Sequence, residues 1–300
     1  MKPEELKNKE LLPPNGTDLL CRHLIETTYD DLSEDNIRIF KDRLLDMTGC
    51  IFGGAIVPED RFFYDLLKKQ GGAPEAPLFA EQRSLRLPLT SAGMHNCLQA
   101  RANDFGNMAM VVFDDPIACH FGETILPMNL TLADVFGCTG KEFIANNIAA
   151  EDTVGRILYT LPVRWPTDME LVSTAATAVA IRYYKLDAGK AKVAFSFAAT
   201  NATDPGNAYY DYSQEFKYHN AESARCGIMS AELAKGGWRG LEDPFFGNAG
   251  LITKKMPAGT LPDLYEKAFD ELGKKYFTEV RFKRGPGGMP TIATAELGMK

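Results

Sequence analysis

The sequence predicts a mainly α-helical protein with a small α/β segment at its C-terminal end. Apolar residues recur at helical spacing through most of the 300 residues. Residues that cap helices precede these apolar stretches, and glycines follow them. Aromatic and β-branched residues gather into a strand-like segment near the C-terminus, YFTEVRFKRG. Together these observations favour packed helices with few strands.

The first two predicted helices each combine a starting signal, an apolar face and a glycine. Ser33 caps a helix that stops near Gly49. A second helix begins about Pro58 and ends at Gly71, which follows the rule of early proline and late glycine. The residues expected on their apolar faces are Ile37, Phe40, Leu44 and Leu45 in the first helix and Phe62, Phe63, Leu66 and Leu67 in the second.

Residues 72–90 contain three prolines and no sustained period, which indicates a connection or a short extended piece. Ser91 then opens another helix. Thr139 and Glu142 form a T-x-x-E capping box ahead of the next long apolar stretch.

Small side chains dominate the later helices. The Ala-rich segment 173–181 predicts a helix that its neighbours approach closely. Asp187 caps a helix that extends through Ala199, and another Ala- and Ser-rich helix covers about 220–235. A last helix starts at 260–262 and ends at Gly273.

The C-terminal segment predicts one strand and a turn, followed by the start of a helix at 293–297. A single strand cannot satisfy its own hydrogen-bonding groups. Either the chain stops just after entering a second, α/β-type region, or another chain supplies the missing strands. We therefore divide the chain into a helical domain, 1–270, and the beginning of a second domain, 271–300.

Composition excludes several classes of function. A formal charge of −7 and a pI near 5.3 argue against non-specific nucleic-acid binding. The apolar runs are too short to cross a bilayer, and the start MKPEELKNKELLPPNG has no apolar core for secretion, so we expect a cytoplasmic protein without a membrane partner. The six cysteines show no CxxC pair and no histidine at zinc-ligand spacing, so we expect no metal.

The segment 101–127, RANDFGNMAMVVFDDPIACHFGETILP, contains the strongest candidates for chemistry. It places Asp104 and His120 around a loop between two predicted helices. Only four histidines occur in the chain, and one in a polar loop before an apolar helix is a candidate proton carrier. In the structural alternative, Asp104 caps a helix or turn and His120 caps or packs against a helix.

The order of motifs along residues 17–300 resembles the MmgE/PrpD family, whose members include 2-methylcitrate dehydratase, cis-aconitate decarboxylase and iminodisuccinate epimerase. The resemblance implies a large all-helical domain, a smaller α/β lid, and an active site between them. This chain then holds only a truncated lid stub, because members of the family are about half again as long. The motifs that carry the resemblance are LLDMTGCIFGG, NCLQARANDF, HFGETILPMNLTLAD, GRIL, STAATAVAIRYYKLDAGKAKVAFSFA, HNAESARCGIMSAELAKGGWRG and FKRGPGG.

The resemblance also implies which residues form the site. The catalytic residues would be His120 as proton carrier, Asp104 orienting it or sharing the proton, and Lys217 holding a carboxylate. The residues that would contact the substrate are His219, Met108, Trp165 and Lys283. The chain departs from the family pattern where Met108 replaces a threonine and Trp165 a histidine, which predicts a more apolar pocket and a ligand with fewer charges than a tricarboxylate.

Two classes of function follow. In the first, the protein is a divergent lyase or isomerase that moves protons on a small carboxylic acid without a cofactor. In the second, it is a catalytically inactive helical subunit that binds a ligand or a partner chain. We expect a homodimer, or a hetero-oligomer with a chain that supplies the missing lid.

Overall fold

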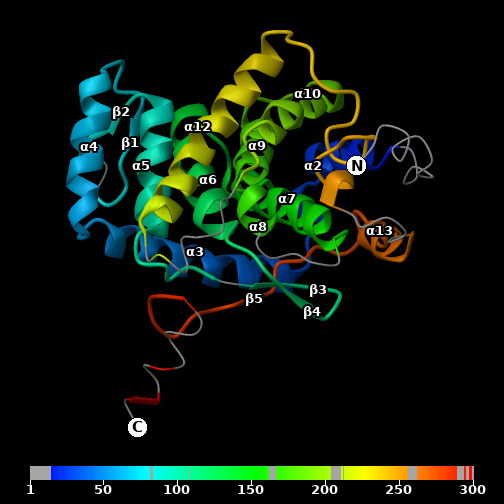
Figure 1. The fold of residues 1–300 in the computed structure, drawn as a ribbon, viewed down its shortest axis with the longest axis horizontal. Helices are drawn as coiled ribbons and strands as arrows, with labels where there is room; N and C mark the ends of the chain where they lie inside the picture. Colours follow the sequence, from blue (N-terminus) through cyan, green and yellow to red (C-terminus); the bar gives the residue numbers. More distant parts are fainter. Residues whose placement is uncertain are drawn as a thin grey trace.

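The computed structural model is mainly helical, as predicted, and describes residues 15–81, 84–107, 109–161, 167–203, 211, 213–255, 262–288, 294 and 297–298. Helices form most of the molecule, and a small sheet lies along one side of them (Figure 1). The elements are α2 (Gly16–Glu26), η1 (Tyr29–Asp31), α3 (Glu34–Gly54), α4 (Pro58–Gln70), β1 (Ala76–Pro77), β2 (Arg86–Leu87), α5 (Leu89–Arg101), β3 (Ala109–Val112), β4 (Asp115–Ala118), α6 (Gly122–Phe136), α7 (Gly140–Tyr159), α8 (Thr167–Glu170), α9 (Val172–Tyr183), α10 (Ala188–Ala199), α12 (Glu215–Lys235), η2 (Thr253–Lys255), α13 (Pro262–Phe269) and β5 (Val280–Arg281).

The centre of the helical domain is formed by α5 and α9, whose side chains are almost all buried. Helix α9 packs against α6, α7, α10 and α12. Its small side chains allow α12 to come very close, because a Cβ on Gly227 would lie 2.6 Å from the carbonyl carbon of Ala176. The prediction that the Ala-rich helix has close neighbours is confirmed.

The predicted N-caps are confirmed. Ser33 accepts a hydrogen bond from the backbone N–H of Asn36 at the start of α3. Thr139 and Glu142 satisfy each other's backbone N–H groups at the start of α7. Asp187 accepts from the backbone N–H of Lys190 at the start of α10 (2.9 Å). These side chains satisfy N–H groups that the first helical turn would leave without partners.

Several predicted boundaries and faces are wrong. Helix α3 passes through Gly49 and ends at Gly54, because a lone glycine on an open helix face weakens a helix without ending it. Its buried face follows Phe40 and Met47, whereas Leu45 is 76% exposed. Helix α12 begins at Glu215, about one turn before the predicted start, and α5 begins two residues before Ser91.

In helix α4 the predicted face is half right. Phe63 and Leu67 are buried, whereas Phe62 and Leu66 are exposed. Gly71 follows the helix with a φ of 77°, as expected of a glycine that ends one. The connection at 72–90 contains the short antiparallel pair β1–β2.

The C-terminal strand has partners within this chain, which corrects the expectation that they were missing. β5 pairs with β3, and β3 pairs with β4, giving an antiparallel sheet of order β4-β3-β5. Phe113 and Asp114 both have positive φ angles in the two-residue turn between β3 and β4. Such turns usually carry Asn-Gly or Asp-Gly, so the sequence Phe-Asp did not indicate a hairpin.

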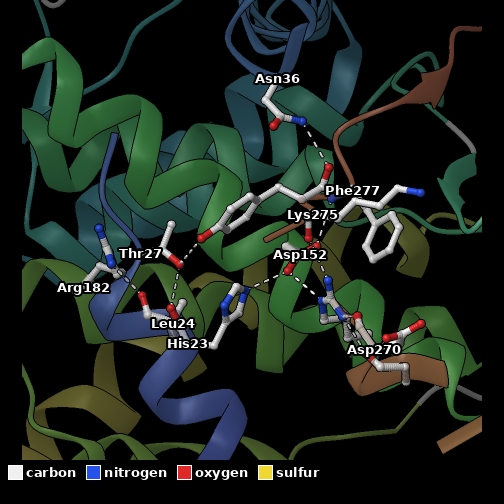
Figure 2. Close-up of polar contacts among 12 residues, drawn as sticks. His23, Leu24, Thr27, Asn36, Asp152, Arg182, Asp270, Lys275 and Phe277 are labelled. Carbon is white, nitrogen blue, oxygen red and sulfur yellow. Dashed lines mark hydrogen bonds and ion pairs between the residues drawn. The ribbon is translucent and has the colours of Figure 1, made fainter. Parts of the chain in front are cut away.

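A buried ionic cluster fastens residues 268–278 to the helical domain (Figure 2). Asp152 of α7 accepts hydrogen bonds from His23 Nε2 (2.7 Å), Arg156 Nε (2.8 Å) and the backbone N–H of Phe277 (2.9 Å). Arg156 also donates to the carbonyl oxygens of residues 268, 270 and 275. The i,i+4 pair of Asp152 and Arg156 therefore holds the chain leading into β5.

A second buried ion pair includes Glu151, the residue before Asp152 in α7. Arg43 of α3 forms a bidentate ion pair with Glu151 of α7, and both side chains are almost fully buried. Arg43 also donates to the carbonyl oxygen of Thr278 (3.3 Å). Asn36 donates a hydrogen bond to the carbonyl oxygen of Tyr276 (Figure 2) and another to the hydroxyl of Thr278. The segment that follows, with Lys283, is thus placed by the helical domain.

Candidate functional site

The candidate site lies where the C-terminal segment meets the loop after α5. Asp104 adopts a left-handed conformation there, with a φ of 47°. The backbone N–H of Gly287 donates to the carbonyl oxygens of Asn103 (3.3 Å) and Asp104 (3.0 Å). Two of the motifs that carry the family resemblance, RANDF and FKRGPGG, therefore meet in space.

The carboxylate of Asp104 is held by two cations. Lys283 Nζ donates to Asp104 Oδ1 (2.7 Å) and to its carbonyl oxygen (2.9 Å). Arg101, three residues before Asp104, also forms an ion pair with its carboxylate. The side chain of Lys283 is only 2% exposed, so this contact is shielded from water.

Asp104 is ionised in this arrangement. Burial alone raises its pKa, but Arg101, Lys283 and His120 together outweigh burial, so the pKa of Asp104 is lowered from 3.8. His120 is itself buried and lies between β4 and α6.

Two site residues escaped sequence reasoning, Arg101 and Glu123. Arg101 Nη1 donates to Glu123 Oε1 (3.1 Å), and both residues are fully buried. Gly106 fits over Glu123, because a Cβ at this position would lie 2.6 Å from its Cγ. The available signals were the one cation within RANDF and the one acid in HFGETILP.

Lys217, the third predicted catalytic residue, has a different partner. It lies in the first turn of α12, and its Nζ pairs with Glu59 Oε1 of α4 (3.2 Å). Lys217 and Arg101 both lie near the ring of Phe216. The distances from the ring centre are 5.8 Å to Lys217 Nζ and 4.9 Å to the guanidinium of Arg101. His219 is half-buried on the same helix, where its carbonyl oxygen accepts from Ser223 Oγ (2.8 Å).

The structure thus brings Asp104 and Lys283 together, while Lys217 pairs with Glu59. The predicted substrate contacts Met108 and Trp165 lie outside the described residues. Within the described ranges, no group of three or more His, Cys, Asp or Glu side chains could hold a metal ion. Nor is any described helix both long enough and apolar enough to span a membrane.

Changing Asp104 to Asn should lower the free energy of unfolding by about 2 kcal/mol at pH 7, because a charged hydrogen bond to Lys283 is lost. The folded pKa of Asp104 lies below 3.8, so its stabilisation is complete above that pH and disappears as the pH falls through the folded pKa. Urea unfolding of both proteins across this range measures the difference. Asp114→Asn is the control, because Asp114 also has a positive φ but is exposed. If wild type and Asp104→Asn still differ by the same free energy of unfolding below the folded pKa, the ionic contribution of Asp104 is contradicted.

The comparison with known families gives a match over most of the chain. Residues 18–259 match the MmgE/PrpD N-terminal domain family. A search of curated proteins found no match. The matched range includes the helices that carry Arg101, Glu123 and Lys217, and the loop that carries Asp104 and His120. The chain belongs to the MmgE/PrpD family.

Proposed function

We propose that this protein is a lyase or isomerase that moves a proton on a small carboxylic acid without a cofactor. Membership of the MmgE/PrpD family suggests a dehydratase or lyase type of function. The observation that supports the finer proposal is the ion pair of Asp104 with Lys283, in the same segment of the chain as the buried His120. We assign proton transfer to the imidazole of His120, with this carboxylate and cation as its supporting groups.

In the proposed reaction His120 removes a proton from the carbon next to a carboxylate. The electron pair moves toward that carboxylate, and cations stabilise the enolate-like charge. In an epimerisation a proton then returns to the opposite face of the same carbon; in an elimination the hydroxyl on the neighbouring carbon takes up a proton and leaves as water. Because the pKa of Asp104 is lowered, this side chain carries no proton to donate near neutral pH. We assign it to holding Lys283 and stabilising protonated His120.

The charge balance of the site favours a substrate with few negative charges. Arg101 and Lys283 are already paired with carboxylates, and Lys217 is paired with Glu59. Met108 in place of the family's threonine and Trp165 in place of its histidine also favour a substrate with few negative charges. Tight binding of citrate-like acids with several carboxylates, measured by calorimetry, would count against this part of the proposal.

The pairing of these cations with carboxylates of the protein also supports a second candidate function. If the cations serve only to bind the C-terminal segment to the helical domain, the protein is a non-catalytic subunit that binds a ligand or a partner chain. The contacts of Lys283 and Gly287 with residues 103–104 favour this alternative. It also predicts assembly as a homodimer or with a second chain, which light scattering would detect.

The experiment that separates the two is exchange of substrate C–H protons for solvent deuterium, followed by NMR. The panel contains hydroxy-, imino- and unsaturated di- and tricarboxylates, and the variant is His120→Ala. Exchange that disappears in a folded His120→Ala protein supports the enzyme. No exchange with any compound by the folded wild type would reject it in favour of the non-catalytic subunit.

A further inference from the structure

The ammonium group of Lys217 already holds a carboxylate, and that carboxylate belongs to the protein. Its Nζ lies 3.2 Å from Glu59 Oε1. Gln214, just before α12, donates a second hydrogen bond to the same oxygen. The first turn of α12 therefore binds one carboxylate oxygen of α4 with a cation and an amide.

This pair is within reach of solvent. The side chains of Lys217 and Glu59 are 13% and 26% exposed, unlike the fully buried pair of Arg156 and Asp152. Part of this pair is therefore open to solvent, so dissolved ions reach it more easily than they reach a fully buried pair.

Glu59 lies in the first turn of α4, directly after Pro58. Its pKa is lowered first by a hydrogen bond from its own backbone N–H, and then by Lys217 and Gln214. Glu59 is therefore anionic near neutral pH, and the positive end of the α4 dipole favours its charge whether or not Lys217 is paired with it.

We infer that Glu59 is an internal competitor that occupies the carboxylate-binding place on Lys217 until a ligand carboxylate displaces it. The inference rests on the proposed function, since it assigns Lys217 to carboxylate binding. Displacement would leave the ligand carboxylate beside Phe216, whose ring also contacts Arg101. Glu59 would then set the ligand concentration at which the site fills.

The test is binding of succinate to the full chain by calorimetry. An internal competitor that occupies Lys217 nine-tenths of the time lowers the apparent affinity roughly tenfold. Glu59→Gln keeps the shape of the side chain and removes its charge, so its Kd for succinate is expected to fall about tenfold. The gain should be absent in the double variant Glu59→Gln/Lys217→Gln, and uncharged succinamide should show none.

Glu222→Gln is the matched control. It removes the same charge from α12, the helix of Lys217, where Glu222 pairs with Arg225, and should leave the Kd unchanged. Equal succinate binding by wild type and Glu59→Gln, or a gain that persists in the double variant, overturns the inference. Failure of both proteins to bind succinate also overturns it.

A second measurement needs no ligand. Acetylation of Lys217 by acetic anhydride, followed by mass spectrometry, should be several-fold faster in folded Glu59→Gln than in wild type, because the paired amine is shielded. An unchanged rate overturns the inference as well. Both measurements are independent of catalysis. They can support the role of Glu59 even if deuterium exchange shows no enzyme activity. Conversely, loss of exchange in His120→Ala can support the enzyme even if both measurements on Glu59 fail.

Discussion

Replacing Asp152 by Asn is expected to lower the free energy of unfolding by about 3–5 kcal/mol, since it leaves a buried cation without its counter-charge. Both oxygens of Asp152 accept hydrogen bonds, one from Phe277 N–H and the other from Arg156 and His23. An asparagine would point its NH2 group at one of these donor sets. Chemical denaturation at pH 7, followed by circular dichroism, measures the loss.

The control for this variant is Asp65→Asn. Asp65 forms an ion pair with Arg61 that also spans four residues, but both side chains are exposed. Exposed pairs contribute little, so the control should change stability by less than about 0.5 kcal/mol. Equal effects at the two positions would refute the view that the buried cluster fastens residues 268–278.

Replacing Gly54 by Ala is expected to destabilise the fold by about 3 kcal/mol, at the upper end of the usual effect of overpacking. Gly54 lies against α5, where a Cβ would be 1.9 Å from the carbonyl oxygen of Gln99. This neighbour is backbone inside a fully buried helix, so it cannot move aside as a flexible side chain does.

Gly49→Ala, in the same helix, should have the opposite effect. A Cβ at Gly49 meets nothing within 4 Å, so the variant is expected to stabilise α3 by about 0.5–1 kcal/mol through helix propensity. Thermal unfolding of both variants gives the comparison. A neutral Gly54→Ala would show that α3 and α5 are not in close backbone contact.

The same two glycines show how far the sequence could predict the fold. Helix caps such as Ser33 and Thr139 are local, because the side chain and the N–H it satisfies are three residues apart, and these predictions were correct. The role of a glycine depends on what lies opposite it in space. From sequence alone, Gly49 looked like a stop, and nothing indicated that Gly54 touches α5.

The site was predictable to a similar extent. Asp104, His120 and Lys283 were named from the sequence and its family resemblance, and the structure pairs Asp104 with Lys283; their roles stay predictions. Glu59 could not be found this way, because its contact with Lys217 joins residues 158 positions apart. The prediction of a domain boundary at residue 270 stays a prediction.

The pairing of β3 with β5 has a consequence for how the protein is made. Met110 lies opposite Val280, so β3 leaves the ribosome long before its partner is synthesised. At 5–20 residues per second this interval is roughly 10–30 s. During that time the β3–β4 hairpin has an edge strand with unpaired backbone groups, which is the kind of surface that chaperones or other nascent chains can bind. The sheet, and the placement of Lys283 beside Asp104, can therefore form only late in biosynthesis, after the helices that receive them.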